Sequence, residues 1–160
     1  MDASSSVLGV DFGGTICEDH DRSELLGGYS QIRAKMGAFI AIREFVDLLN
    51  GRVCIISKCS EKSEALIMHW LRYFGFFRAT HMSEKNVFFC RERGDKAGIC
   101  RKVGVTTFVD NRLEVLSHMA GIVPVRYLIC PDEAEVQRFA SALGGVRRVQ
   151  SWHEIMNMEL

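Results

Sequence analysis

Val7-Leu8-Gly9-Val10-Asp11-Phe12-Gly13-Gly14-Thr15 is the stretch that decides the fold, because a short apolar run ends there in an aspartate and a pair of glycines. Such a run is typical of a strand that is buried on both faces of a parallel sheet. The glycines allow a turn in which the backbone comes close to a ligand. Ligands of open α/β sheets bind beyond the carboxyl ends of the strands. We therefore expect Asp11 to serve as a metal ligand, a nucleophile or a polar group that faces phosphate.

Further apolar runs alternate with amphipathic stretches along the rest of the chain. Together with the first run they predict five strands, at residues 7–11, 53–57, 87–90, 106–110 and 125–130. Helices are expected between and after them, at residues 37–49, 61–74, 95–103, 112–120 and 132–143. This alternation predicts an α/β fold with three layers, in which a five-stranded parallel sheet has helices on both faces in a Rossmann-like arrangement.

Two segments fall outside this alternation. Residues 16–36 contain the polar cluster Glu18-Asp19-His20-Asp21 and are expected to form a flap loop beside Asp11, with the cluster solvated rather than part of a site. Residues 147–160 predict a short strand and a terminal helix led by Trp152, packed on the edge of the sheet. With no linker or repeat in the sequence, residues 1–160 are expected to form a single domain without a large cap.

Charge and composition argue against several classes of protein. The 160 residues include 20 Lys or Arg and 20 Asp or Glu, so the formal net charge is zero and predicts no nonspecific binding to nucleic acid. No run approaches the roughly 20 apolar residues of a membrane helix, and the start lacks the pattern of a secretory signal. The six cysteines form no C-x-x-C pair and are expected to stay reduced. We expect a cytoplasmic protein that does not bind membranes; its oligomeric state stays open.

Four polar residues stand at strand ends or at the start of a helix. Asp11, Ser57 and Asp110 end predicted strands, and Lys96 begins the helix that follows the third strand. These positions lie at the ligand-binding edge of a parallel sheet. Two carboxylates suit a divalent cation, while a lysine, a hydroxyl and a helix N-terminus suit phosphate oxygens. The pattern indicates a phosphate site with a metal ion.

With these residues the sequence resembles the haloacid dehalogenase superfamily, most members of which are phosphatases or phosphotransferases with an aspartyl nucleophile. The resemblance covers residues 7–130. It implies that Asp11 is both the nucleophile and a ligand of Mg²⁺, that the backbone carbonyl of Gly13 also faces the metal, and that Asp110 completes the metal site. Lys96 would neutralise charge between Asp11 and the phosphoryl group.

The resemblance also implies which residues hold the substrate. Ser57 and Lys58, with Gly14 and Thr15 of the first turn, would bind the transferring phosphoryl group. The protein would then be a Mg²⁺-dependent hydrolase or phosphotransferase that acts on a phosphorylated small molecule or macromolecule.

The sequence departs from the pattern of the superfamily at two positions. Phosphatases of the superfamily usually have a second aspartate two residues after the nucleophile, as general acid and base, and here that position is Gly13. General acid–base catalysis typically contributes about 10²–10⁴-fold to the rate. Asn111 stands where a paired aspartate is common, and Glu114 is a candidate to support the metal site in its place.

Two alternatives remain open. The missing aspartate favours a catalytically weakened protein of the same fold that binds phosphate without useful turnover. The Gly-rich turn after Asp11 also resembles the first phosphate loop of sugar kinases and actin-like ATPases. In those proteins the glycines lead into a second apolar strand of a hairpin, whereas here they lead into a polar segment.

Overall fold

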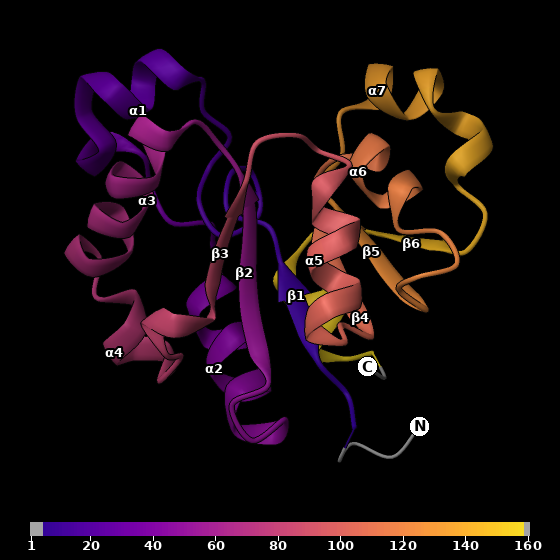
Figure 1. Cartoon of the computed structure of the whole chain (residues 1–160), viewed down its shortest axis with the longest axis horizontal. Helices are drawn as coiled ribbons and strands as arrows, with labels where there is room; N and C mark the ends of the chain where they lie inside the picture. The colour runs from indigo at the N-terminus through magenta and orange to yellow at the C-terminus, as the bar shows by residue number, and fades with distance from the viewer. Residues whose placement is uncertain (1–4, 159–160) are drawn as a thin grey trace.

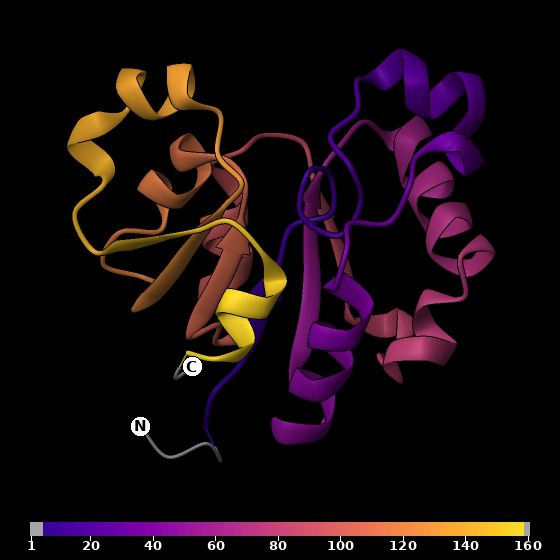
Figure 2. The ribbon, with the colours of Figure 1, turned by 180° about the vertical axis from the view of Figure 1, so that it is seen from behind.

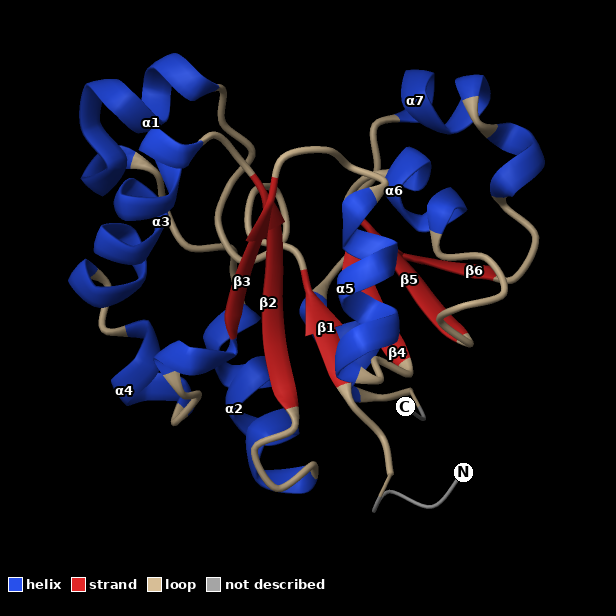
Figure 3. Cartoon of the chain, in the orientation of Figure 1, coloured by secondary structure: helices blue, strands red, loops and turns tan. Residues whose placement is uncertain are grey.

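The computed structural model describes residues 5–158. Its centre is a sheet in which all neighbouring strands are parallel, in the order β3-β2-β1-β4-β5-β6 (Figures 1 and 3). The strands are β1 (Leu8–Val10), β2 (Val53–Lys58), β3 (Val87–Cys90), β4 (Thr107–Asp110), β5 (Val125–Ile129) and β6 (Val146–Val149). The three-layer α/β fold and the five predicted strands are confirmed.

The sheet has six strands rather than the predicted five. The sixth, β6, is the short strand predicted at the start of residues 147–160, and it pairs in parallel with β5, from Arg126↔Val146 to Ile129↔Val149. It is an edge strand in which only Val149 is buried, so its sequence lacks the continuous apolar run that marks an inner strand.

Helices cover both faces of the sheet. One face packs against α2 (Ala38–Leu48), α3 (Glu61–Tyr73), α4 (Phe76–Thr80) and α8 (Trp152–Met156). The other packs against α5 (Asp95–Val103), α6 (Leu113–His118) and α7 (Glu133–Arg138). Figure 1 shows α5 in front of the sheet, and Figure 2 shows α2 and α8 in front of its opposite face. The helix predicted at 132–143 is shorter than expected, because α7 gives way to a 3₁₀ turn, η3 (Ala140–Ala142).

The central strands supply side chains to two separate cores. Val10 and Ile55 belong to the core beneath α2, whereas Ile56 and Phe108 belong to the core beneath α5. Gly9 in β1 has no side chain for a structural reason: a β-carbon there would lie 2.5 Å from the Phe108 ring. The first strand is therefore enclosed on both faces, which fixes where Asp11 emerges.

The flap predicted as a loop contains a helix, so that prediction was wrong. Residues Arg22–Gly28 form α1, followed by a 3₁₀ turn, η1 (Tyr29–Gln31). Asp21 and Glu24 make a capping box: Asp21 accepts from the backbone N–H of Glu24, and Glu24 accepts from that of Asp21. The chain after η1 is tied to α3, because the indole of Trp70 donates to the carbonyl of Ile32 at 2.8 Å.

Two shorter elements between α3 and β3 were not predicted. They are α4 and the 3₁₀ turn η2 (Glu84–Asn86). The predicted terminal helix exists as α8, but it lies beside α2 on a face of the sheet rather than at its edge (Figure 2). Within residues 5–158, no helix is both long and apolar enough to cross a bilayer.

Candidate active site

The carboxyl ends of the central strands surround a cavity of about 340 Å³. The predicted residues Asp11, Gly13, Ser57, Lys58, Lys96, Asp110 and Asn111 all line it. They come from β1, β2, α5 and β4, or from the residues directly after these strands, because parallel strands present their carboxyl ends at one edge. Four distant parts of the chain thus meet around one space.

Lys96 joins the two buried aspartates. Its Nζ donates to Oδ1 of Asp11 at 2.6 Å and to Oδ2 of Asp110 at 2.8 Å. All three residues are less than a tenth exposed. Because both carboxylates reach the same ammonium nitrogen, they are close enough together to share one cation.

The electrostatics of this triad follow from burial. Burial disfavours the ammonium, but the charges of Asp11 and Asp110 outweigh it and raise the pKa of Lys96. Burial, followed by repulsion from Asp11, raises the pKa of Asp110 to about 7, while Lys96 acts in the opposite direction. One ammonium thus incompletely compensates two enclosed carboxylates, so further positive charge would stabilise the ionised site.

The turn that follows Asp11, residues 12–17, is held by contacts from three directions; we call it the Asp11 turn. Ile16 N–H donates to the carbonyl of Phe12 at 2.8 Å and closes it. The Lys35 ammonium donates to the carbonyl of Gly14 at 2.9 Å. The indole N–H of Trp152 donates to the carbonyl of Thr15 at 2.8 Å. The flap and the terminal helix therefore both position the nucleophile candidate.

We predict that Trp152→Phe lowers the free energy of unfolding by about 1–3 kcal/mol, because it keeps most of the buried ring and leaves the Thr15 carbonyl unpaired. Urea denaturation measures the loss. Trp70→Phe is the matched control: Trp70 is also fully buried and donates to a backbone carbonyl, that of Ile32. Both variants should lose similar stability, but only Trp152→Phe should weaken binding of inorganic phosphate. Equal phosphate affinity in the two variants would contradict a positioning role for Trp152.

Gly14 and Thr15, two of the predicted phosphate ligands, are not among the residues that line the cavity. Gly14 has φ +75° and lies beneath Asn111; a β-carbon there would come within 2.1 Å of Asn111 Nδ2. Thr15 is fully buried, and its hydroxyl reaches Oδ2 of Asp11 only at 3.5 Å. Ser57 and Lys58 remain the predicted phosphate ligands that reach the cavity.

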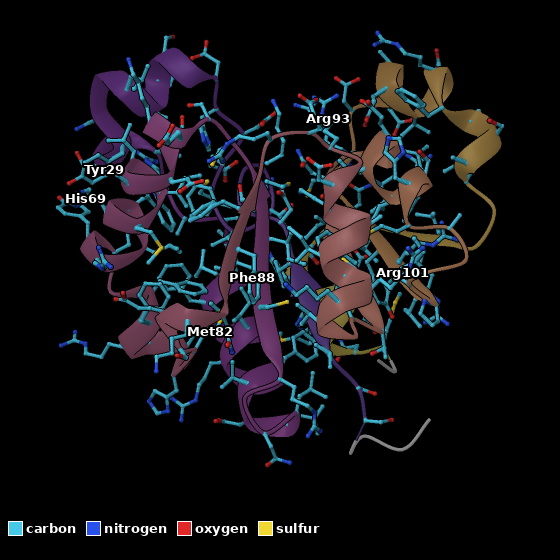
Figure 4. The ribbon with its side chains drawn as sticks, in the orientation of Figure 1. Tyr29, His69, Met82, Phe88, Arg93 and Arg101 are labelled. Carbon is cyan, nitrogen blue, oxygen red and sulfur yellow. The ribbon has the colours of Figure 1, made fainter. Side chains whose placement is uncertain are left out.

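Of the two residues expected to support the metal site, one lies where it was predicted. Asn111 lines the cavity and packs on Gly14. Glu114 does not line the cavity; it forms an ion pair with Arg93, on the loop between β3 and α5 (Figure 4). The backbone N–H groups of Leu113 and Glu114, at the start of α6, donate to the carboxylate of Glu135. The cavity lining thus includes Asn111 and not Glu114.

The structure adds residues that the sequence did not predict. Asp19, His20 and Asp21 of the flap line the cavity, although Asp19 and Asp21 are exposed, as expected of a solvated cluster. Arg93 and Arg112 line it as well, and Arg112 pairs with Asp19 at 3.4 Å. The flap folds back over the strand ends, and no local sequence signal reveals such a contact.

The donor set fits a hard divalent cation. Mg²⁺ is commonly bound by one or two carboxylates, keeps several waters and binds substrate phosphates. Asp11 and Asp110 supply such carboxylates. Across residues 5–158, no three His, Cys, Asp or Glu side chains cluster as an all-protein metal cage. The site thus suits an ion that shares its coordination with water and substrate.

Comparison with solved structures identifies the architecture. The chain overlays the D,D-heptose 1,7-bisphosphate phosphatase of B. bronchiseptica, solved with magnesium and phosphate, with a TM-score of 0.68 at 15% identity, over 94% of this chain and 96% of that one. This chain has the haloacid dehalogenase fold. A haloacid dehalogenase family hydrolase of Deinococcus radiodurans R1, with bound phosphate and sodium, gives a TM-score of 0.67 at 12% identity, over 96% and 94% of the two chains.

A third structure with the haloacid dehalogenase fold agrees over part of its length. A protein of Burkholderia xenovorans LB400 described as a haloacid dehalogenase-like hydrolase gives a TM-score of 0.60 at 17% identity, over 86% of this chain and 64% of that one. No family model matches the sequence, and no curated protein matches it. The likeness is one of fold. The parallel neighbours of β1 on both sides do not fit the hairpin of a sugar kinase or actin-like ATPase.

Proposed function

We propose that this protein is a Mg²⁺-dependent hydrolase or phosphotransferase that acts on a phosphorylated substrate through an aspartyl nucleophile at Asp11. The observation that carries the proposal is the contact of one buried ammonium, Lys96, with both Asp11 and Asp110 at the floor of the cavity. The fold is shared with a magnesium- and phosphate-bound phosphatase.

The residues divide the reaction between them. Oδ2 of Asp11, which does not face Lys96, would attack phosphorus in line with the leaving oxygen. Lys96 would hold Asp11 in place and offset the negative charge of the site. Ser57 and Lys58 would donate hydrogen bonds to phosphoryl oxygens. Asp11, the Gly13 carbonyl and Asp110 would hold Mg²⁺, which supplies positive charge to the phosphoryl group when bound.

The substrate would reach an open site. Among the described residues between β1 and β2, the flap adds only α1 and η1, α2 packs on the sheet, and no inserted cap domain is present there. A phosphorylated small molecule and a phosphorylated group on a macromolecule would therefore both fit. The second candidate function, phosphate binding without turnover, is favoured by one observation, Gly13 in the place of the usual acid–base aspartate.

We predict that the purified protein hydrolyses p-nitrophenyl phosphate only with Mg²⁺, because the aryl leaving group needs little protonation and the enclosed carboxylates need the metal. EDTA should remove the activity and excess Mg²⁺ should restore it. Mg²⁺ should also raise the melting temperature of the wild type and not that of Asp110→Asn, with Asp132→Asn as the exposed control. Binding of phosphate with no turnover would support the binding protein instead.

A further inference from the structure

The space above Gly13 is filled from the flap. A β-carbon at Gly13 would lie 3.2 Å from Cε1 of His20, 3.8 Å from its Nδ1 and 3.9 Å from its Nε2. The Gly13 backbone does not have a positive φ, so it is not conformation that excludes a side chain there. The ring of His20 thus stands beside the position from which an aspartate two residues after Asp11 would extend. His20 also lines the cavity that contains Asp11 and Lys96.

The imidazole of His20 is held in a defined orientation. Its Nδ1 lies 3.1 Å from the carbonyl oxygen of Glu18. The same nitrogen lies 3.6 Å from Sγ of Cys17. Because a carbonyl can only accept, Nδ1 carries the hydrogen in the tautomer that bonds to Glu18, and Nε2 is then the nitrogen left to exchange a proton. The ring packs edge-on against Phe12, with centroids 5.9 Å apart. His20 also lines a second cavity, formed by residues of the flap, and its side chain is half-buried.

The other groups near Gly13 are less suited to exchange a proton with a leaving group. Asp21 caps α1, and its hydrogen bonds from Ser23 and from the Glu24 backbone lower its pKa, which keeps it ionised. Asp19 pairs with Arg112 at 3.4 Å. Cys17 is fully buried, and burial together with the charge of Asp11 raises the pKa of its thiol.

We propose that His20 is the general acid and base of the site and takes the place of the aspartate that Gly13 lacks; the proposal rests on the proposed function. As the oxygen of Asp11 bonds to phosphorus and the bond from phosphorus to the leaving oxygen breaks, Nε2 of His20 gives its proton to that oxygen and an alcohol departs. In the second step, Nε2 takes a proton from water. The hydroxyl oxygen bonds to phosphorus, and the bond from phosphorus to Asp11 breaks to release phosphate and restore the carboxylate.

Comparing substrates whose leaving groups differ in their need for a proton tests the assignment of His20. His20→Asn retains an amide that can donate to the Glu18 carbonyl and removes Nε2. We expect its kcat/KM to fall about 10²–10⁴-fold for an alkyl phosphate such as glycerol phosphate. For p-nitrophenyl phosphate, kcat/KM should change less than about 10-fold, since nitrophenolate leaves without a proton. The variant should also release a burst of nitrophenol, because attack of water on the phosphorylated enzyme has lost its base.

Two further variants separate the possible results. His153→Asn, on the exposed side of α8, is the control and should leave both substrates unaffected. Gly13→Asp in the His20→Asn background should regain at least about 10-fold of the alkyl phosphate activity, since asparagine is smaller than histidine and leaves room for the added aspartate. If His20→Asn has the same ratio of alkyl to aryl kcat/KM as the wild type and shows no burst, His20 is not the general acid and base, while the proposed function still stands. A wild type without Mg²⁺-dependent turnover of either substrate would overturn the proposed function and this role with it.

Discussion

Replacement of Asp11 by asparagine is expected to lower kcat for Mg²⁺-dependent hydrolysis of p-nitrophenyl phosphate by at least about 10³-fold. The amide has the size of the carboxylate, and its oxygen can still accept from Lys96, but it is a far weaker nucleophile and carries no charge for the metal. The first bond of the reaction, between Asp11 and phosphorus, would then not form. Steady-state kinetics at saturating Mg²⁺ measures the effect.

The same variant must be shown to be folded. Its thermal transition should stay cooperative, since the hydrogen bond at 2.6 Å from Lys96 has an acceptor in either side chain. Asp47→Asn is the matched control, an exposed aspartate on α2 paired with Arg43, and it should retain full activity. If Asp11→Asn keeps more than about a tenth of the wild-type kcat while Asp47→Asn is normal, Asp11 is not the nucleophile.

The sequence predicted the centre of the site because strand ends are local signals. Asp11 and Asp110 each close an apolar run, and Lys96 begins a helix after another. In a parallel sheet such positions converge whatever the loops do. The same reasoning does not decide which turn residues line the cavity: Gly14 packs against Asn111, the Thr15 carbonyl accepts from Trp152, and neither residue is in the lining.

The flap was harder to predict because its helix has little apolar surface. Among the α1 residues whose burial the structure describes, 23–28, only Leu25 is buried in the core, so the three- and four-residue apolar period that indicates a helix is absent. The capping box of Asp21 and Glu24 was the available signal, four residues that mark a helix start without any periodicity. The place of His20 over Gly13 depends on how the whole flap folds back, which spacing along the chain does not reveal.

Replacement of Lys96 by methionine is expected to lower the free energy of unfolding by about 3–5 kcal/mol and to abolish turnover. Methionine fills much of the same buried volume, but it leaves the carboxylates of Asp11 and Asp110 enclosed without their shared donor. A buried charge that loses its partner costs far more than a surface ion pair contributes. Urea denaturation in EDTA measures this loss without interference from bound metal.

Two companion variants show whether charge or packing causes the loss. Lys102→Met, on the exposed side of α5, should change stability by no more than about 0.5 kcal/mol. The double variant Lys96→Met/Asp110→Asn should be more stable than Lys96→Met, because it removes one of the two repelling carboxylates. Mg²⁺ should stabilise Lys96→Met more than it stabilises the double variant, since the metal would replace the missing positive charge between two carboxylates. If the double variant is the less stable of the two, Lys96 acts through packing, and the ion-sharing arrangement on which the proposed function depends is wrong.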